Sequence, residues 1–462
     1  MRITLLLFFL LITQSLVANI DSTQYVVVNS IQFEGNSKTK EFVLLRELSF
    51  ISGDTLLLTE LDKRALRSNE NLFNTSLFNK VSYQIILNNN QADIVYSLEE
   101  RWYVWPYPIL ENGDRNFNTW WQTKDFNRLT YGVYLNWFNF RGRNETFKIL
   151  MKVGFENQFS LGYDIPNLNK KKTLGLNVAT GYAEYKEVNN RSVENKRIFY
   201  KSSDGPGRQV VFAKAKLTYR KSLNSRHSFG VRYDQVRVDT GVTSSSIDYL
   251  KSNQQESEFF TLYYYGKYDT RDYIDYPLKG YKIETYISKY GLGVFNNEGL
   301  NVLTSIVGLY WHKPLGGRWY FANSMVGKWS FFDSTPYSLQ RGLGYANSIR
   351  GYELYVMDGE RYGIIKTNIK FNLLKKREVH LSWLKVNEFN DPYFAMYLNA
   401  FFDAGYASDQ LYGDLNLLSN RWAYGYGVGL DVTAFYDFVM RLEYSFNREN
   451  ESGFFLHFKK AI

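Results

Sequence analysis

The chain has no cysteine among its 462 residues and only four histidines. The missing cysteines exclude disulfides, thiol catalysis, cysteine-ligated metals and a lipid anchor on cysteine. The histidines are scattered and lack the spacing of a metal site. Neither a phosphate-binding P-loop nor the Gly-x-Ser-x-Gly turn of serine hydrolases occurs. We therefore expect no catalytic residue, no metal and no cofactor.

Long apolar runs are also missing beyond the N-terminus, where no stretch reaches the ~18 uninterrupted apolar residues of a membrane-spanning helix. The N-terminus itself has a basic Arg2, an apolar run from Ile3 to Ile12 and a small residue at Ala18. This pattern predicts a secretory signal peptide over residues 1–18, because the run is too short to anchor the chain. If an exported chain of this kind enters a membrane, it must cross with strands.

Aromatic residues are abundant, with 38 Tyr, 34 Phe and 10 Trp making up 18% of the chain, yet the mean hydropathy is only −0.36. Tyr and Trp suit a boundary between hydrocarbon and water. A membrane β-barrel reconciles the two observations, because apolar lipid-facing residues alternate with polar lumenal ones. The net charge of +9 is spread along the chain, which argues against nucleic acid as a partner and fits a polar lumen.

Residues 25–100 have a different pattern from the rest of the chain. Strand-like segments lie at 25–33, 80–87 and 92–98, and apolar residues with helical spacing lie at 40–48 and 59–73. Thr59 is the expected N-cap of the second helix, with Asp62 as the acid of a capping box. The order β-α-α-β-β predicts a small α/β domain.

Residues 103–462 alternate between apolar and polar side chains, which predicts strands. In residues 438–446, for example, one face is entirely apolar and the other carries Arg441 and Glu443. We expect about 16 antiparallel strands, an even number typical of single-chain membrane barrels. Their expected starts are near 104, 129, 145, 157, 173, 208, 227, 258, 280, 301, 318, 361, 393, 422, 436 and 453. A β-sandwich also alternates, but this many strands behind an export signal favour a closed transmembrane barrel.

Four motifs occur within this region. They are Ser348-Ile349-Arg350-Gly351-Tyr352 in a long loop at about 333–362, Phe401-Phe402-Asp403-Ala404-Gly405 at a strand end, the turn Asp269-Thr270-Arg271-Asp272 followed by Gly280, and the run Gly425-Tyr426-Gly427-Val428-Gly429. They resemble the barrel signatures of the BamA/TamA superfamily of outer-membrane assembly and translocation proteins. The R-G-Y and F-x-D-x-G patterns match that family's loop and strand motifs, and residues 25–100 are similar to its POTRA module. The resemblance runs from about residue 25 to the C-terminus.

The resemblance implies that the loop arginine, Arg350, folds into the lumen and meets the strand carboxylate of Asp403. The residues agree, because Asp403 lies on the polar phase of its strand and a buried carboxylate needs a cationic partner. Gly351 would allow a sharp turn beside the pair, and Tyr352 and Gly405 complete the two motifs. The alternative is that Arg350 is a solvated loop residue.

A second candidate site is the first expected barrel strand, which contains Pro106 and Pro108. Prolines two residues apart remove two N–H donors on the same side of a strand. The first strand closes against the last, which contains Gly453, so we hypothesise a weak seam at which client strands are templated. The alternative is that residues 105–108 form only a linker between the domains.

These features lead to an expected function as an outer-membrane protein assembly or insertion factor, with the POTRA-like domain in the periplasm. The expected partners are outer-membrane lipid and unfolded client polypeptides, with periplasmic or lipoprotein accessory subunits as a further class. A dedicated polypeptide secretion pore of the same superfamily is the first alternative, although such relatives usually carry two POTRA domains and a plug helix. A passive porin or structural barrel is the alternative from another class.

Overall fold

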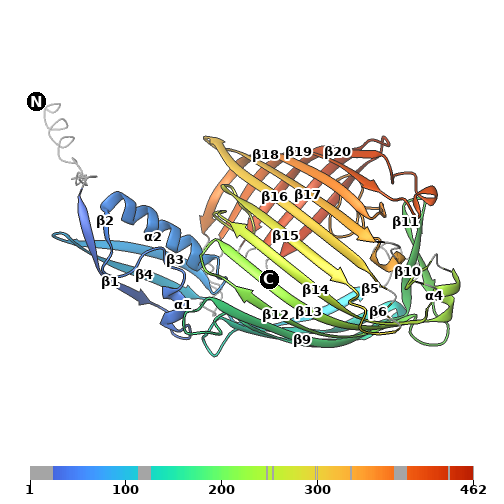
Figure 1. The fold of residues 1–462 in the computed structure, drawn as a ribbon. Helices are drawn as coiled ribbons and strands as arrows, with labels where there is room; N and C mark the ends of the chain where they lie inside the picture. Colours follow the sequence, from blue (N-terminus) through green and yellow to red (C-terminus); the bar gives the residue numbers. More distant parts are fainter. Residues whose placement is uncertain are drawn as a thin grey trace, which may run out of the picture.

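The computed structural model describes residues 24–112, 126–245, 248–251, 254–296, 298, 300–332, 336–378, 393–434 and 438–460. The predicted signal peptide, residues 1–18, lies outside these ranges. Figure 1 shows a small α/β domain, coloured blue, at one end of a large β-barrel. None of the helices within the described ranges is both long and apolar enough to cross a bilayer.

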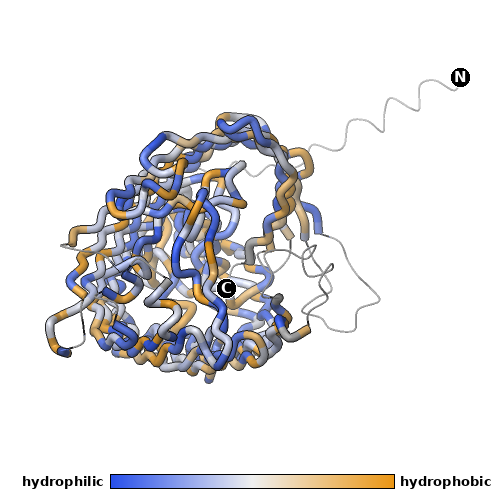
Figure 2. The backbone as a smooth tube through the Cα atoms, turned by 90° about the vertical axis from the view of Figure 1, so that its right-hand side faces the viewer, coloured by the Kyte–Doolittle hydropathy of each residue, from blue (hydrophilic) through white to orange (hydrophobic). Residues whose placement is uncertain are grey.

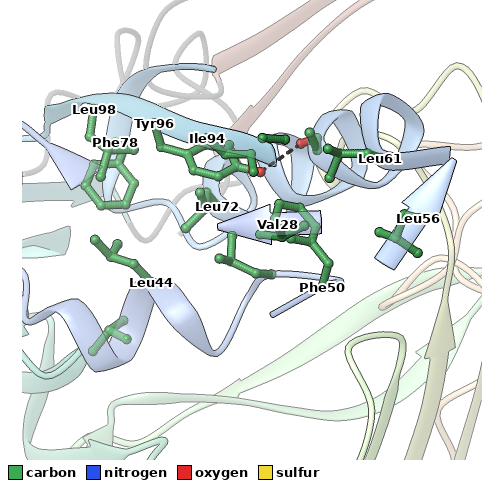
Figure 3. Packing of buried hydrophobic residues seen from close by; sticks show 14 of the residues in the cluster. Val28, Leu44, Phe50, Leu56, Leu61, Leu72, Phe78, Ile94, Tyr96 and Leu98 are labelled. Carbon is green, nitrogen blue, oxygen red and sulfur yellow. Dashed lines mark hydrogen bonds between the residues drawn. The ribbon is translucent and has the colours of Figure 1, made fainter. Parts of the chain in front are cut away.

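The small domain consists of β1 (Tyr25–Glu34), α1 (Glu41–Leu45), β2 (Thr55–Leu57), α2 (Leu58–Phe73), β3 (Phe78–Asn88) and β4 (Gln91–Glu100). Its sheet has the order β2-β1-β4-β3, with β1 and β4 parallel. The apolar faces of both helices and the sheet form one core, which includes Val28, Leu44, Leu61 and Tyr96 (Figure 3). The order agrees with the predicted β-α-α-β-β, with the short strand β2 added between the helices.

The predicted cap of helix α2 is wrong. The helix begins at Leu58 with Leu57 in the N-cap position, so Thr59 lies within the first turn and no side chain caps the helix. The chain passes directly from β2 into α2, and burial of Leu58 in the core sets the helix start one residue before Thr59. Asp62 instead accepts a hydrogen bond of 2.9 Å from the Tyr83 hydroxyl on β3.

The barrel is a sheet of 16 strands. Its strands are β5 (Val104–Asn112), β6 (Leu129–Phe140), β7 (Glu145–Gly154), β8 (Glu156–Ile165), β9 (Leu174–Tyr185), β12 (Arg208–Tyr219), β13 (Ser225–Val238), β14 (Glu256–Asp269), β15 (Gly280–Tyr290), β16 (Val302–Gly316), β17 (Trp319–Phe332), β18 (Arg361–Glu378), β19 (Tyr393–Ser408), β20 (Trp422–Ala434), β21 (Phe438–Asn447) and β22 (Ser452–Lys460). The expected starts fall within two residues of these.

Hydrophilic and hydrophobic residues alternate along the barrel strands (Figure 2), as a membrane-spanning wall requires. On β16, Leu303, Leu309 and Trp311 are exposed on the outer surface, whereas Val302 and Thr304 are buried toward the lumen. Acidic residues gather on the lumenal phase of β19 to β21, where Asp403, Asp431 and Glu443 are buried. The outer surface is therefore apolar and the lumen polar, which confirms the predicted transmembrane barrel.

The end of the barrel far from the α/β domain is covered by segments that we call the distal cap (Figure 1). The distal cap comprises the hairpin β10 (Glu187–Val193) and β11 (Lys196–Lys201), helix α4 (Thr240–Ser245), and residues 336–360 and 409–421. Asn195 at the hairpin tip joins its parts, because its carbonyl accepts a 2.8 Å hydrogen bond from Val356 N and its N–H donates to Asn416 Oδ1 at 2.8 Å. The sequence pattern had not indicated this hairpin.

Candidate functional site

A buried ion pair joins the distal cap to the barrel wall. Arg350, in the 336–360 segment, donates from Nε to Asp403 Oδ2 at 2.8 Å and from Nη2 to Asp403 Oδ1 at 2.6 Å. The backbone N–H of Arg350 also donates to Asp403 Oδ2, at 3.2 Å. Asp403 on β19 is fully buried and Arg350 is nearly so. The bidentate geometry fixes both the position and the orientation of the loop inside the lumen.

Three further groups surround the Arg350 guanidinium. Its Nη1 donates to Glu443 Oε1 at 3.1 Å and to Asn368 Oδ1 at 2.9 Å, and its centre lies 3.7 Å from the Phe401 ring centroid. A buried cation is tolerated only when its donors are satisfied, and these contacts satisfy them from three strands. The motifs did not identify Glu443 and Asn368, although both lie on the polar phase of predicted strands.

Glycines allow the loop to approach the wall this closely. Gly351 adopts φ +90°, a conformation that favours glycine. A Cβ atom on Gly425 of β20 would lie 1.8 Å from the Arg350 carbonyl oxygen, and one on Gly405 would lie 2.9 Å from Ile349 Cδ1. Tyr352 is buried beside them, and its hydroxyl donates to Glu449. The glycines of these motifs therefore leave the space in which the loop packs against the barrel wall.

The Asp269-Thr270-Arg271-Asp272 turn connects β14 and β15 at the opposite end of the barrel. Arg271 donates from Nε and Nη2 to the two oxygens of Asp269, at 2.8 and 2.9 Å. Asp272 Oδ1 accepts backbone N–H bonds from Tyr273 and Leu278, at 2.9 and 3.0 Å. A Cβ on Gly280 would lie 2.5 Å from the Thr270 carbonyl oxygen. These hydrogen bonds hold the residues of the turn together.

This turn is one of the places where the α/β domain docks. Arg67 Nη1 on α2 donates to the Arg271 carbonyl at 3.2 Å, and Asn74 Nδ2 donates to the Asp272 carbonyl at 2.8 Å. These partners are 204 and 198 residues apart in the chain. Sequence spacing therefore gave no signal for them.

The same turn also enters the lumen. Tyr276 is buried there, with its hydroxyl donating to Asp431 Oδ2 at 2.7 Å and its ring centroid 4.7 Å from that of Tyr397. The Lys370 ammonium lies 3.9 Å from the Tyr276 ring centroid. Tyr276 and Arg350 thus occupy the lumen from opposite ends, and a polar cavity of about 470 Å³ touches both the turn and Arg350.

The first and last strands form the second candidate site. Hydrogen-bonded ladders join all other neighbours in the 16-stranded sheet, whereas the described residues of β5 and β22 share none. Gly453 on β22 lies opposite Ser445 of β21. Residues 105–108 lie within β5 rather than in a linker. Within the described residues, the two strands therefore have edges at the seam that are not joined by a ladder.

The register shows which way the β5 prolines face. Phe138 N donates to the Tyr103 carbonyl at 2.8 Å, and this antiparallel register continues into β5 and β6 without a shift. Because hydrogen-bonded and non-hydrogen-bonded pairs alternate, odd-numbered residues of β5 bond to β6 and even-numbered ones face away. The N–H groups that Pro106 and Pro108 lack would therefore belong to the free edge.

The comparisons with known proteins match both parts of the chain. Residues 26–101 match the POTRA family, described as a surface antigen variable number repeat, and residues 139–454 match the Omp85 superfamily domain. BamA from Haemophilus ducreyi lacking POTRA domains 1–3 is 14% identical, with 94% of this chain and 85% of that chain covered and a TM-score of 0.52. CdiB from Escherichia coli is 11% identical, with 94% and 76% covered and a TM-score of 0.55. No curated protein matches the sequence.

Proposed function

Because the chain belongs to the Omp85 superfamily, whose members insert or secrete polypeptides and are not enzymes, we propose that it is an outer-membrane assembly or insertion factor. In this proposal, client polypeptides engage the barrel at the seam between β5 and β22, and the POTRA domain lies in the periplasm. The observation that carries the proposal is the absence of a ladder between the described residues of these two strands.

A free strand edge can accept an incoming strand through main-chain hydrogen bonds, which need no particular client sequence. Pro106 and Pro108 remove two donors from the free edge of β5, so a ladder formed there between β5 and β22 would be weaker than the others. A seam that exchanges the pairing of β5 with β22 for pairing with a client strand needs a weak ladder between β5 and β22. The prolines therefore support opening at this seam rather than elsewhere in the wall.

Within the described residues, the barrel strands are also shortest at the seam. β5 and β22 have 9 residues each, whereas β14 and β15, which lie opposite the seam in the strand order, have 14 and 11. At ~3.3 Å per residue and a tilt of about 45°, the short strands span roughly 21 Å, less than the ~30 Å hydrocarbon core. A bilayer that meets this wall must thin locally, which lowers the barrier to insertion beside the seam.

The POTRA sheet offers a second free edge. Strand β3 ends the order β2-β1-β4-β3, and near its start Lys80 Nζ lies 3.2 Å from Glu378 Oε2 at the end of β18. A client strand that pairs with β3 would therefore be held at the rim of the barrel. This placement supports delivery from the POTRA domain to the barrel.

The test is depletion of the protein in its host, followed by proteomics of the outer membrane. An assembly factor predicts the loss of many barrel proteins, whereas loss of one secreted protein would replace the proposal with a dedicated secretion pore. Conductance of the purified protein tests the porin alternative. We expect small, intermittent currents because Arg350 and Tyr276 occupy the lumen, and a large, steady current would favour a porin.

A further inference from the structure

Four cations on one side of the lumen form no salt bridge with any described residue. We call Lys148 of β7, Lys214 and Lys216 of β12, and Arg226 of β13 the basic wall. Some other lumenal cations have close partners, such as Lys282 with Glu284 at 2.9 Å and Arg232 with Asp234 at 2.7 Å. None of the four basic-wall residues has a hydrogen bond or a salt bridge within the described part of the chain. Cations held together without partners repel each other, so the wall favours an anionic ligand.

The strand register gives the basic wall its shape. Neighbouring strands place Lys148 opposite Gly162, Gly162 opposite Ala179, and Ala179 opposite Lys214. Because strands lie ~4.8 Å apart, the two lysines lie three strand spacings apart in this row, with only the small residues Gly162 and Ala179 between them. Asp164 is an acidic residue in the adjacent row, two strands from Lys216. The one negative charge of Asp164 does not balance the four positive charges of the basic wall, so an excess of positive charge remains.

A lumenal cavity lies against this wall. It has a volume of about 530 Å³ and is lined by Lys214, Lys216 and the Arg232–Asp234 pair on one side. Its other side is tyrosine-rich, contributed by β14 and β15, namely Tyr263, Tyr265, Tyr286 and Tyr290. The volume falls within the range of ligand-binding cavities, and tyrosine offers both an apolar ring and a hydroxyl. The cavity can therefore hold a chain that carries both charge and apolar groups.

The basic wall lies toward the POTRA end of the lumen. Strand β12 ends at Tyr219, three residues after Lys216, and Arg220 then pairs with Glu47 of the POTRA domain. Lys148 likewise lies near the start of β7, close to the turn whose Gly142 carbonyl bonds to Lys40 N of the POTRA domain. A polypeptide that enters from the POTRA side would meet these cations first.

We propose that the basic wall binds an acidic segment of a client polypeptide in an extended conformation. The proposal rests on the proposed function, since it names the substrate class that the lumen accepts. Lys214 and Lys216 project from the same face of β12 about 6.6 Å apart, which is the spacing of alternate side chains in any extended chain. Carboxylates at every second position of a client therefore match the two ammonium groups and form charge-assisted hydrogen bonds.

Binding of labelled peptides to the purified full-length protein in detergent tests this directly. A peptide of alternating Glu and Thr should bind, and its affinity should fall with added salt. The double variant K214Q/K216Q should weaken binding by about tenfold. The matched control K282Q removes a lumenal charge that is already paired and should leave the affinity unchanged. K214R/K216R keeps both charges and should bind as the wild type does.

Equal binding of a Gln-Thr peptide, or unchanged affinity in K214Q/K216Q, would overturn the proposal. Loss of binding in K214R/K216R would overturn it as well, because the charge would then not be the cause. Tighter binding of polygalacturonate than of the acidic peptide would assign the site to anionic glycans instead. These outcomes are independent of the depletion experiment, so failure of the basic wall and failure of the assembly role can be told apart.

Discussion

Glu47 of the POTRA domain and Arg220 of the barrel form a bidentate ion pair, with Nη1–Oε1 and Nη2–Oε2 distances of 2.5 and 2.7 Å. Glu47 is buried, and Arg220 directly follows β12. With the contacts of Arg67 and Asn74 to the β14–β15 turn, this pair fixes the POTRA domain against the barrel rim. A movement of the POTRA domain would therefore also displace the β14–β15 turn. Tyr276, which this turn places in the lumen, would move with it.

The substitution Glu47→Gln should loosen this junction. It leaves the Arg220 guanidinium partly buried without its counter-ion, which we expect to cost about 1–3 kcal/mol of docking energy. Spin labels on one added cysteine in each domain would report the distance between them, since the chain has no cysteine of its own. A broader distance distribution is expected.

The matched control for this experiment is Arg64→Gln, which removes an exposed ion pair with Glu60 within the same domain. Such surface pairs contribute little, so the distribution should keep its wild-type width. If Glu47→Gln and Arg64→Gln gave the same narrow distribution, the junction would not depend on the Glu47–Arg220 pair.

The Arg350–Asp403 pair should show strong thermodynamic coupling. Removing either side chain alone leaves a buried charge with fewer partners, which should cost about 3–5 kcal/mol of unfolding free energy. The double variant R350A/D403A should cost less than the sum of the single variants. Denaturant unfolding of the protein in vesicles measures all four species, and additive losses would show that the two residues do not interact energetically.

Gly425→Ala should displace the 336–360 loop from the lumen. The new methyl group would lie 1.8 Å from the Arg350 carbonyl oxygen, and the wall backbone cannot move away without breaking its ladder. We expect larger ionic conductance in planar bilayers. Gly363→Ala on β18 is the control, because no heavy atom lies within 4 Å of its Cβ position. Equal conductance in the two variants would mean that Gly425 does not seat the loop.

Much of this architecture was predictable from local patterns. Alternation along each strand reports directly on the two faces of the wall, so strand positions followed from the sequence. The Arg350–Asp403 pair followed from two motifs and the polar phase of Asp403. The prediction that Thr59 caps helix α2 was wrong because burial of Leu58 in the core outweighed the local preference of threonine for the N-cap position. The seam between the first and last strands was suggested by Pro106 and Pro108, whereas the POTRA docking contacts depend on packing between distant segments, which leaves no periodic signal.

The distal cap should respond to pH through Asp409. Burial near Glu360 and Asp358 raises the pKa of the Asp409 carboxyl to about 6, and its Oδ2 has no hydrogen-bond partner among the described residues. Because the folded state favours the protonated form, Asp409 contributes stability below about pH 4 that is lost as pH rises through 6. Protection factors from hydrogen exchange in residues 409–421 should fall over this interval.

Asp409→Asn provides the check on that assignment. The amide imitates the protonated carboxyl and can still accept the Tyr412 N–H bond, which is 2.8 Å in the wild type. Protection in the variant should therefore stay level between pH 4 and 7. A variant that kept the full pH dependence of the wild type would assign the effect to another group.

The most direct measurement of the central claim is client insertion into vesicles by a protein whose seam can be locked. Cysteine pairs joining β5 at Tyr107 or Ile109 to β22 at Phe455 or His457 would be the only thiols in the chain. We predict that the oxidised protein no longer accelerates insertion of an unfolded barrel protein and that reduction restores the rate. Full activity of the cross-linked protein would contradict the proposal that clients enter at the seam.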